Sequence, residues 1–113
     1  DANEFEENSL KKYGLIKEIA PRYRSTYFAH IFSGGYSSGY YSYVHSAVLD
    51  SDGFNAFKET GDVFDPELAK RLREHVYAKG STEEAMDLYV KFRGKKPMIE
   101  PLLKVRGLNE INK

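Results

Sequence analysis

Residues that start and end helices recur along this sequence and constrain its fold more than any other feature. Asp65 and Pro66 predict the start of one helix, because aspartate caps the free N–H groups and proline suits the first helical position. Gly80 is predicted to end this helix, and Ser81 with Glu84 forms a capping box that opens the next one. Alternating strand patterns are hard to find, so the sequence predicts an all-α fold.

Apolar residues repeat at helical spacing within these two segments, so each helix has one side that can face a core. The stripe of the first helix is Leu68, Leu72 and Val76, and that of the second is Ala85, Leu88, Tyr89 and Phe92. Gly94 is predicted to end the second helix. A last short helix is predicted after Pro97, carrying Leu102, Leu103 and Val105.

The first third of the chain is less regular. Asn3 with Glu6 predicts a helix start, and Gly14 predicts its end. The apolar residues expected on the inner side of this helix are Phe5, Leu10 and Tyr13. From residue 15 to residue 32 no clean period is visible and Pro21 interrupts any helix, so this stretch is predicted to be extended or looping. The side chains expected to pack inward from it are Tyr23, Tyr27 and Phe28.

Length and charge limit the classes of protein to which the chain can belong. A chain of 113 residues is at most one domain, or a piece of a larger one. Its 17 basic and 17 acidic side chains cancel, which argues against nucleic-acid binding because that normally needs a basic surface. The apolar runs are far too short to span a membrane, so no membrane partner is expected.

The cysteine content and the first residue bear on where the protein works. There are no cysteines, which excludes disulfides and thiolate zinc sites and is compatible with a reducing compartment. The chain begins at Asp1 without a methionine, so we expect a processed or fragmentary chain whose targeting segment cannot be read. The expected location is the cytoplasm.

The most unusual stretch is HIFSGGYSSGYYSY, residues 30–43, with four tyrosines in its last eight positions. If these positions are helical, Tyr36, Tyr40 and Tyr43 fall within an arc of about 60°, at about 100° per residue. A second stripe, pointing elsewhere, consists of Tyr41, Val44 and Val48. Two stripes in register predict a packed helix and not a disordered low-complexity linker.

Two interpretations of the tyrosine stripe follow. In the first it is a core or interface surface, because aromatic rings bury large areas and tyrosine tolerates a half-wet position. In the second it lines a ligand site. The Gly34-Gly35 loop would let backbone N–H groups approach a ligand, and the phenolic hydroxyls could donate to an oxyanion as it forms. His30 would add a further donor or acceptor.

The chain carries no complete catalytic set. The zinc peptidase motif HExxH needs two histidines four residues apart on one helical face, with a glutamate between them as base. His30, His45 and His75 are separated by 15 and 30 residues, so none of them fits that spacing. No Gly-x-Ser-x-Gly nucleophile elbow is present either. The second interpretation therefore has hydrogen-bond donors but no nucleophile, base or metal ligand in this chain.

Four ordered blocks of the sequence are similar to one enzyme family. They are PRYRSTYFAHIF, HIFSGGYSSGYYSYV, AVLDSDGFNAFKETGDVFD and LYVKFRGKKPMIEPLLKVRGL. In this order they resemble the C-terminal region of the thimet oligopeptidase and peptidyl-dipeptidase family of zinc metallopeptidases, and they are most similar to its bacterial peptidyl-dipeptidase branch. The resemblance covers essentially the whole chain.

The resemblance implies a fold and an activity. Members of that family are mostly helical, with two lobes around a deep channel that admits short peptides. Their zinc is held by HExxH and a further glutamate, upstream of the segment that this chain resembles. The chain would thus be a C-terminal helical fragment of the catalytic domain, with short peptides and the upstream part of the same polypeptide as its partners. It would be inactive in isolation.

The resemblance also implies roles for residues of the Gly/Tyr stretch. Tyr36 and Tyr43 match tyrosines that hydrogen-bond the substrate near the scissile carbonyl, and His30 matches a histidine that contacts substrate there. Tyr40 corresponds to a further active-site tyrosine. Gly34 and Gly35 match a flexible loop that adjusts to different peptides. No residue of this chain is expected to bind the metal.

One position departs from the family, which usually has tryptophan where this chain has His45. On a helical wheel His45 lies well away from Tyr36 and Tyr43, so we expect a packing change with some exposure and not a catalytic role. His75 is expected to be a solvated surface residue. A solvated basic edge is expected from Lys91, Arg93, Lys95 and Lys96.

A non-enzymatic function is the alternative. A small helical module could bind a partner protein through the face formed by Tyr36, Tyr40 and Tyr43, and zero net charge and a short chain are compatible with this. That hypothesis predicts a chain that folds alone and recognises its partner without zinc.

Overall fold

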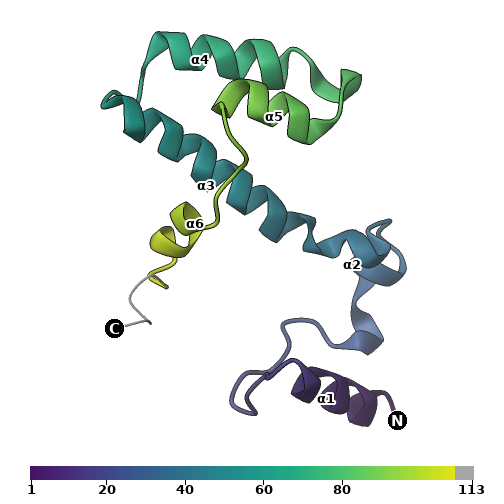
Figure 1. The fold of residues 1–113 in the computed structure, drawn as a ribbon. Helices are drawn as coiled ribbons and strands as arrows, with labels where there is room; N and C mark the ends of the chain where they lie inside the picture. Colours follow the sequence, from purple (N-terminus) through teal and green to yellow (C-terminus); the bar gives the residue numbers. More distant parts are fainter. Residues whose placement is uncertain (109–113) are drawn as a thin grey trace. The chain divides into compact units, whose positions relative to one another are not determined.

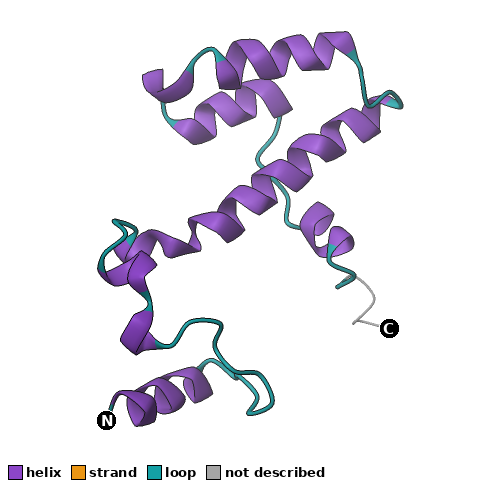
Figure 2. Ribbon diagram, turned by 180° about the vertical axis from the view of Figure 1, so that it is seen from behind, coloured by secondary structure: helices purple, strands orange, loops and turns teal. Residues whose placement is uncertain are grey.

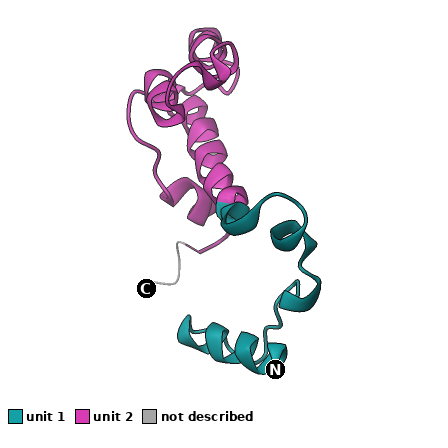
Figure 3. Ribbon diagram, turned by 90° about the vertical axis from the view of Figure 1, so that its right-hand side faces the viewer, with its two compact units in different colours: residues 1–41 teal, residues 42–113 magenta. Residues whose placement is uncertain are grey.

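The computed structural model describes residues 1–108, and this part of the chain is built from helices and turns without a strand (Figure 1, Figure 2). The all-α prediction is confirmed. The chain divides into two compact units, Asp1–Tyr41 and Ser42–Lys113, which are coloured separately in Figure 3 and are described one at a time below.

The first unit begins with helix α1 (Ala2–Lys12), whose N-cap is Asp1 and not the predicted Asn3. The Asp1 carboxylate accepts hydrogen bonds from the backbone N–H groups of Asn3, at 2.7 Å, and Glu4, at 3.4 Å. The sequence-based assignment was wrong because Asn3 already lies inside the helix. The end near Gly14 is confirmed, since Gly14 adopts a left-handed φ of 77° just after the helix.

The apolar side predicted for α1 is largely wrong. Tyr13 is 88% exposed and Phe5 is also exposed, while Leu10 is half-buried. The one buried residue of this helix is the charged Glu6. A single α-helix with so few buried apolar residues depends on polar contacts to attach it to the rest of the unit.

After α1 the first unit contains only short pieces, as the break at Pro21 predicted. These are the 3₁₀ turn η1 (Ser25–Tyr27), the one-turn helix α2 (Ala29–Phe32) and the 3₁₀ helix η2 (Ser37–Tyr41). Tyr23 and Phe28 are half-buried and stack with ring centroids 5.1 Å apart, which agrees with the prediction that they pack inward. Tyr27 is exposed, so that part of the prediction was wrong.

The second unit is built around the long helix α3 (Ser42–Thr60). Helix α4 (Pro66–Leu72) continues into the π-helical turn η3 (Arg73–Tyr77), and the 3₁₀ turn η4 (Gly80–Thr82) leads to α5 (Ala85–Arg93) and α6 (Glu100–Val105). Figure 1 shows α4 and α5 side by side beyond α3, while α6 contacts α3 separately.

Three of these helices share one small core. Its buried members are Ala56 from α3, Leu68 from α4, and Tyr89 and Phe92 from α5. The half-buried residues packed against it are Leu49, Phe57, Leu72 and Val76. The predicted stripes of α4 and α5 are therefore confirmed, except for Ala85, which is exposed in the first turn of α5.

Two helix boundaries predicted in this unit, the start of α4 and the end of α5, are confirmed. The Asp65 carboxylate accepts a hydrogen bond from the Leu68 N–H at 2.7 Å and caps α4, and Gly94 ends α5 with a φ of 81°. The capping box of Ser81 and Glu84 was wrong. Ser81 lies in the 3₁₀ turn η4, and Glu84 precedes α5 without a side-chain hydrogen bond to it.

Other helix boundaries differ from the predicted ones. The helix predicted to run to Gly80 widens to a π-turn over η3 and ends at Tyr77. The last helix begins at Glu100, later than predicted; it buries Leu102 but leaves Val105 exposed. Among residues 1–108, no helix is both long enough and apolar enough to cross a membrane.

Candidate functional site

The Gly/Tyr stretch folds back onto helix α2, which carries His30. The Ser33 N–H donates to the Ala29 carbonyl at 2.8 Å, and the Tyr36 N–H donates to the His30 carbonyl at 3.3 Å. Between these bonds Gly35 adopts a φ of 81°, a conformation that other residues reach only with strain. The loop thereby brings Tyr36 close to His30.

Gly34 makes the closest approach in this loop. A Cβ at this position would lie 2.9 Å from the His30 Cα and 3.0 Å from its carbonyl oxygen, both rigid backbone atoms. We therefore expect Gly34→Ala to push the loop off α2, at a cost of about 1–3 kcal/mol, as for other overpacked sites. Changed NMR resonances of the His30 and Tyr36 rings would report this shift.

Gly39→Ala is the matched control for Gly34→Ala. An added Cβ at Gly39 meets no atom within 4 Å, so the His30 and Tyr36 resonances should stay where they are. Unchanged ring resonances in Gly34→Ala would contradict the packing of the loop against α2.

The His30 imidazole is surrounded by four aromatic rings, and we call these five residues the His30 cluster. Centroid distances from His30 are 5.4 Å to Tyr23, 6.1 Å to Phe28, 6.0 Å to Tyr36 and 5.3 Å to Tyr40. The Tyr36 and Tyr40 rings meet edge to face at 5.6 Å, and Phe28 meets Tyr40 in the same way at 4.8 Å. Contacts of this kind orient the rings as well as burying area.

Three of the predicted site residues, His30, Tyr36 and Tyr40, are thus brought together within the first unit. The route differs from the predicted one, because residues 37–41 form a 3₁₀ helix and not an α-helix starting at Tyr36. Ser37 opens this turn with a positive φ of 47°. Sequence reasoning predicted inward packing for Tyr23 and Phe28 but did not place them around His30.

Tyr43 belongs to the second unit, in the first turn of α3, and its residue surface is 57% exposed. His45, two residues later, is exposed, which agrees with the exposure expected for a polar ring in place of the family's tryptophan. His75 is half-buried in the π-turn, so the expected solvated surface position was wrong.

Glu6 is a buried carboxylate that the sequence did not identify as more than a cap residue. It accepts hydrogen bonds from the Arg24 guanidinium at 2.7 Å, the Ser25 N–H at 2.8 Å and the Ser25 hydroxyl at 2.9 Å. The bond from the Ser25 backbone, followed by that from Arg24, holds the pKa of Glu6 below its usual range. No local pattern could have signalled this role, because the partners lie 18 and 19 residues away.

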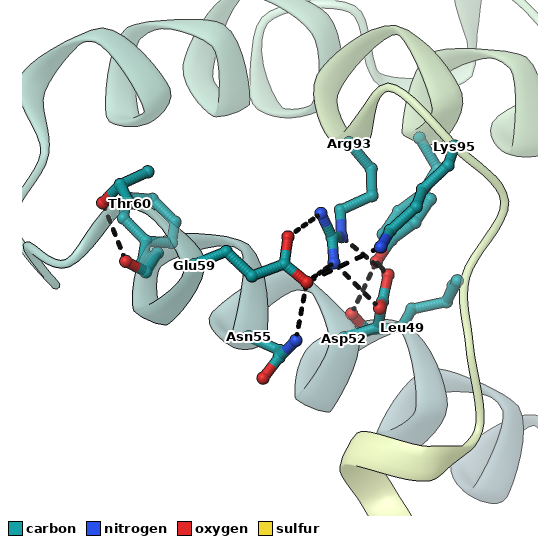
Figure 4. A network of polar contacts seen from close by, with 9 residues as sticks. Leu49, Asp52, Asn55, Glu59, Thr60, Arg93 and Lys95 are labelled. Atoms are coloured by element: carbon teal, nitrogen blue, oxygen red, sulfur yellow. Dashed lines mark hydrogen bonds and ion pairs between the residues drawn. The ribbon is translucent and has the colours of Figure 1, made fainter.

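The second unit contains a larger polar network around Arg93 (Figure 4). Arg93 donates to Asp52 through Nε at 3.0 Å and Nη2 at 3.3 Å, and to both Glu59 oxygens at 2.7 and 2.8 Å. The Tyr89 hydroxyl donates to Asp52 Oδ2 at 2.6 Å. This network joins α3 to α5 with charge-assisted hydrogen bonds.

The central side chains of the Arg93 network are buried. Asp52 is fully buried, and the Arg93 side chain is only 5% exposed, so Arg93 does not belong to the predicted solvated basic edge. Hydrogen bonds from Arg93 hold the pKa of Glu59 low. The hydrogen bonds to Glu59, together with those to Asp52, raise the pKa of Arg93. Burial, followed by the bond to Asp52, raises the pKa of Tyr89. These shifts keep the Glu59 carboxylate and the Arg93 guanidinium charged and the Tyr89 phenol protonated.

Between Asp1 and Leu108, no group of three or more histidine, cysteine, aspartate or glutamate side chains is arranged to hold a metal ion. The part of the chain that the structure describes therefore does not fit a zinc centre of its own.

Comparison with known proteins agrees with the sequence blocks. Residues 1–108 match the model of peptidase family M3. The chain is 44% identical over 110 residues to a dipeptidyl carboxypeptidase of Escherichia coli K12, covering 96% of this chain and 16% of that protein. It is 41% identical over 81 residues to an oligopeptidase A of Haemophilus influenzae, covering 72% of this chain and 12% of that protein.

A plant relative shows the same degree of similarity. A probable cytosolic oligopeptidase A of Arabidopsis thaliana is 43% identical over 84 residues, covering 72% of this chain and 12% of that protein. The chain thus spans less than a fifth of the length of these relatives. Since the family match extends over all of the residues that the structure describes, this chain belongs to peptidase family M3.

Proposed function

We propose that the chain is the C-terminal helical part of the catalytic domain of a zinc-dependent peptidyl-dipeptidase or oligopeptidase, where it forms a substrate-binding wall. The observation that carries this proposal is the His30 cluster, because it gathers donor side chains of the Gly/Tyr stretch within a chain of peptidase family M3.

The side chains proposed to contact the peptide are His30, Tyr36 and Tyr43, and Tyr40 lies beside the first two. A phenolic hydroxyl donates one hydrogen bond, and an imidazole can donate from one ring nitrogen and accept at the other. Such donors stabilise the negative charge that develops on a peptide carbonyl oxygen during hydrolysis. In this role Tyr36 and Tyr43 bind the scissile carbonyl and His30 contacts the neighbouring backbone of the substrate.

The loop at Gly34 and Gly35 is proposed to adapt the site to different peptides. Gly34 allows close packing on α2, and Gly35 supplies a left-handed turn. A loop whose backbone is free of side chains there can place its N–H groups against an extended peptide of any sequence. Short peptides are therefore the proposed substrates.

The metal ligands are proposed to lie in the upstream part of the same polypeptide. When bound there, zinc would supply a Lewis acid and an activated water for hydrolysis. The contribution of this chain is to bind and orient the peptide. We also propose a cytoplasmic location. We expect the isolated chain to be inactive because residues 1–108 contain no group of side chains that could hold a metal ion.

The proposal is tested by comparing the full-length polypeptide with the isolated 113-residue chain. Full-length protein loaded with zinc should hydrolyse short peptides, and a chelator should abolish this until zinc is restored. The isolated chain should release no product at the same concentration. A full-length protein that never cleaves peptides, but binds a partner protein through Tyr36, Tyr40 and Tyr43 without zinc, would favour the interaction module instead.

A further inference from the structure

The carboxylate of Glu6 is the most heavily bonded charged group of the first unit outside the His30 cluster. Its residue surface is only 7% exposed, although most of α1 faces solvent. Oε1 accepts from the Arg24 guanidinium, and Oε2 accepts from both the N–H and the hydroxyl of Ser25. These bonds hold two consecutive residues of the following segment against α1.

The point of attachment is flanked on both sides by members of the His30 cluster. Tyr23 directly precedes Arg24, and the 3₁₀ turn that begins at Ser25 leads into Phe28. The rings of Tyr23 and Phe28 stack on each other, and each lies beside the His30 ring. A shift of the backbone at residues 24–25 would therefore move two of the four rings that surround the imidazole.

Apolar packing does little to replace these bonds. Phe5 of α1 and Tyr13, which directly follows the helix, are exposed, and α1 contacts the η1 turn that Ser25 opens. Charge-assisted hydrogen bonds to a buried carboxylate are stronger than neutral ones and hold their partners in a narrow geometry. Glu6 is thus well placed to fix the position of this segment.

We propose that Glu6 is a positioning residue of the peptidase site. Through Arg24 and Ser25 it holds Tyr23 and Phe28 against His30, and it thereby sets the orientation of the imidazole toward the peptide. The inference rests on the proposed function of His30 and adds a residue that does not touch the substrate.

A double-mutant cycle in the zinc-loaded full-length peptidase tests this role. It compares Glu6→Gln, His30→Ala and the double variant by their kcat/KM for a short peptide. Glu6→Gln should lower kcat/KM about tenfold, because a small misplacement of a binding group reduces the rate strongly. In the His30→Ala background the same change should have almost no further effect, since both variants disturb the same contact.

Controls separate positioning from a general loss of structure. Glu4→Gln changes an exposed carboxylate on the same helix and should leave kcat/KM unaltered. Zinc content should be retained in Glu6→Gln, and the variant should still unfold cooperatively. If that variant fails to fold, Ser25→Ala removes only the hydroxyl bond, and it should lower kcat/KM about threefold with the same dependence on His30.

The outcomes distinguish the inference from the function on which it rests. Full kcat/KM in Glu6→Gln, or an equal loss with and without His30, overturns the positioning role while the proposed function stands. Full kcat/KM in His30→Ala overturns the role of His30 itself, and the inference falls with it. Loss of kcat/KM that disappears in the His30→Ala background supports both.

Discussion

Replacing Tyr43 by phenylalanine in the proposed full-length peptidase is expected to lower turnover by roughly 10²–10³-fold, the usual effect of removing one donor to a developing oxyanion. Phenylalanine keeps the ring and loses only the hydroxyl. Tyr43 lies exposed at the start of α3, where the loss of a hydroxyl leaves no cavity. The change should therefore affect kcat and leave the zinc content and the melting temperature as they are.

The neighbouring tyrosine supplies the control for Tyr43→Phe. Tyr41 is also exposed and belongs to the other predicted stripe, so Tyr41→Phe should retain full turnover. Steady-state kinetics on one short peptide, with zinc measured in each preparation, distinguishes the two variants. Equal turnover in Tyr43→Phe and the wild type would remove the hydroxyl of Tyr43 from the proposed site.

Replacing Arg93 by methionine is expected to lower the free energy of unfolding by about 3–5 kcal/mol, as when one partner of a buried ion pair is removed. Asp52 would remain fully buried and would keep the hydrogen bond from the Tyr89 hydroxyl. The hydrogen bonds that Arg93 of α5 donates to Asp52 and Glu59 of α3 would be lost. Denaturant unfolding followed by far-ultraviolet circular dichroism measures this loss.

Two further variants sharpen the test of the Arg93 network. Lys96→Met removes an exposed charge from the same segment and should change stability by less than about 0.5 kcal/mol. Arg93→Lys keeps the charge but cannot bridge Asp52 and Glu59 with a planar fork, so its loss should be intermediate. If Arg93→Met is as stable as Lys96→Met, the network does not hold the second unit together.

Much of the fold was predictable from local signals. The cap formed by Asp65, the end at Gly94 and the stripes of α4 and α5 each depend on residues within a few positions of one another. The 3₁₀ turn after Tyr36 and the π-turn after Leu72 were not predictable in this way. Each changes the rotation per residue, which a fixed helical period does not anticipate.

The candidate site was predictable in its members but not in its construction. The order of His30, Tyr36 and Tyr40 along the chain, and its similarity to a peptidase family, identified them together. Their contact depends on the loop that returns from Gly35 to α2, and on Tyr23 and Phe28 arriving from the preceding segment. The sequence contains these aromatic residues but does not indicate which of their rings are in contact.

The sequence alone determined the helical class and the family, and it supplied the residues proposed for the site, because caps, periodicity and residue order are local or linear properties. Only the tertiary structure decided which charged side chains are buried. Glu6 meets its partners 18 and 19 residues away, and Asp52 meets Tyr89 and Arg93 across 37 and 41 residues. A charge can be buried only where its partners converge in space, and that convergence has no local period.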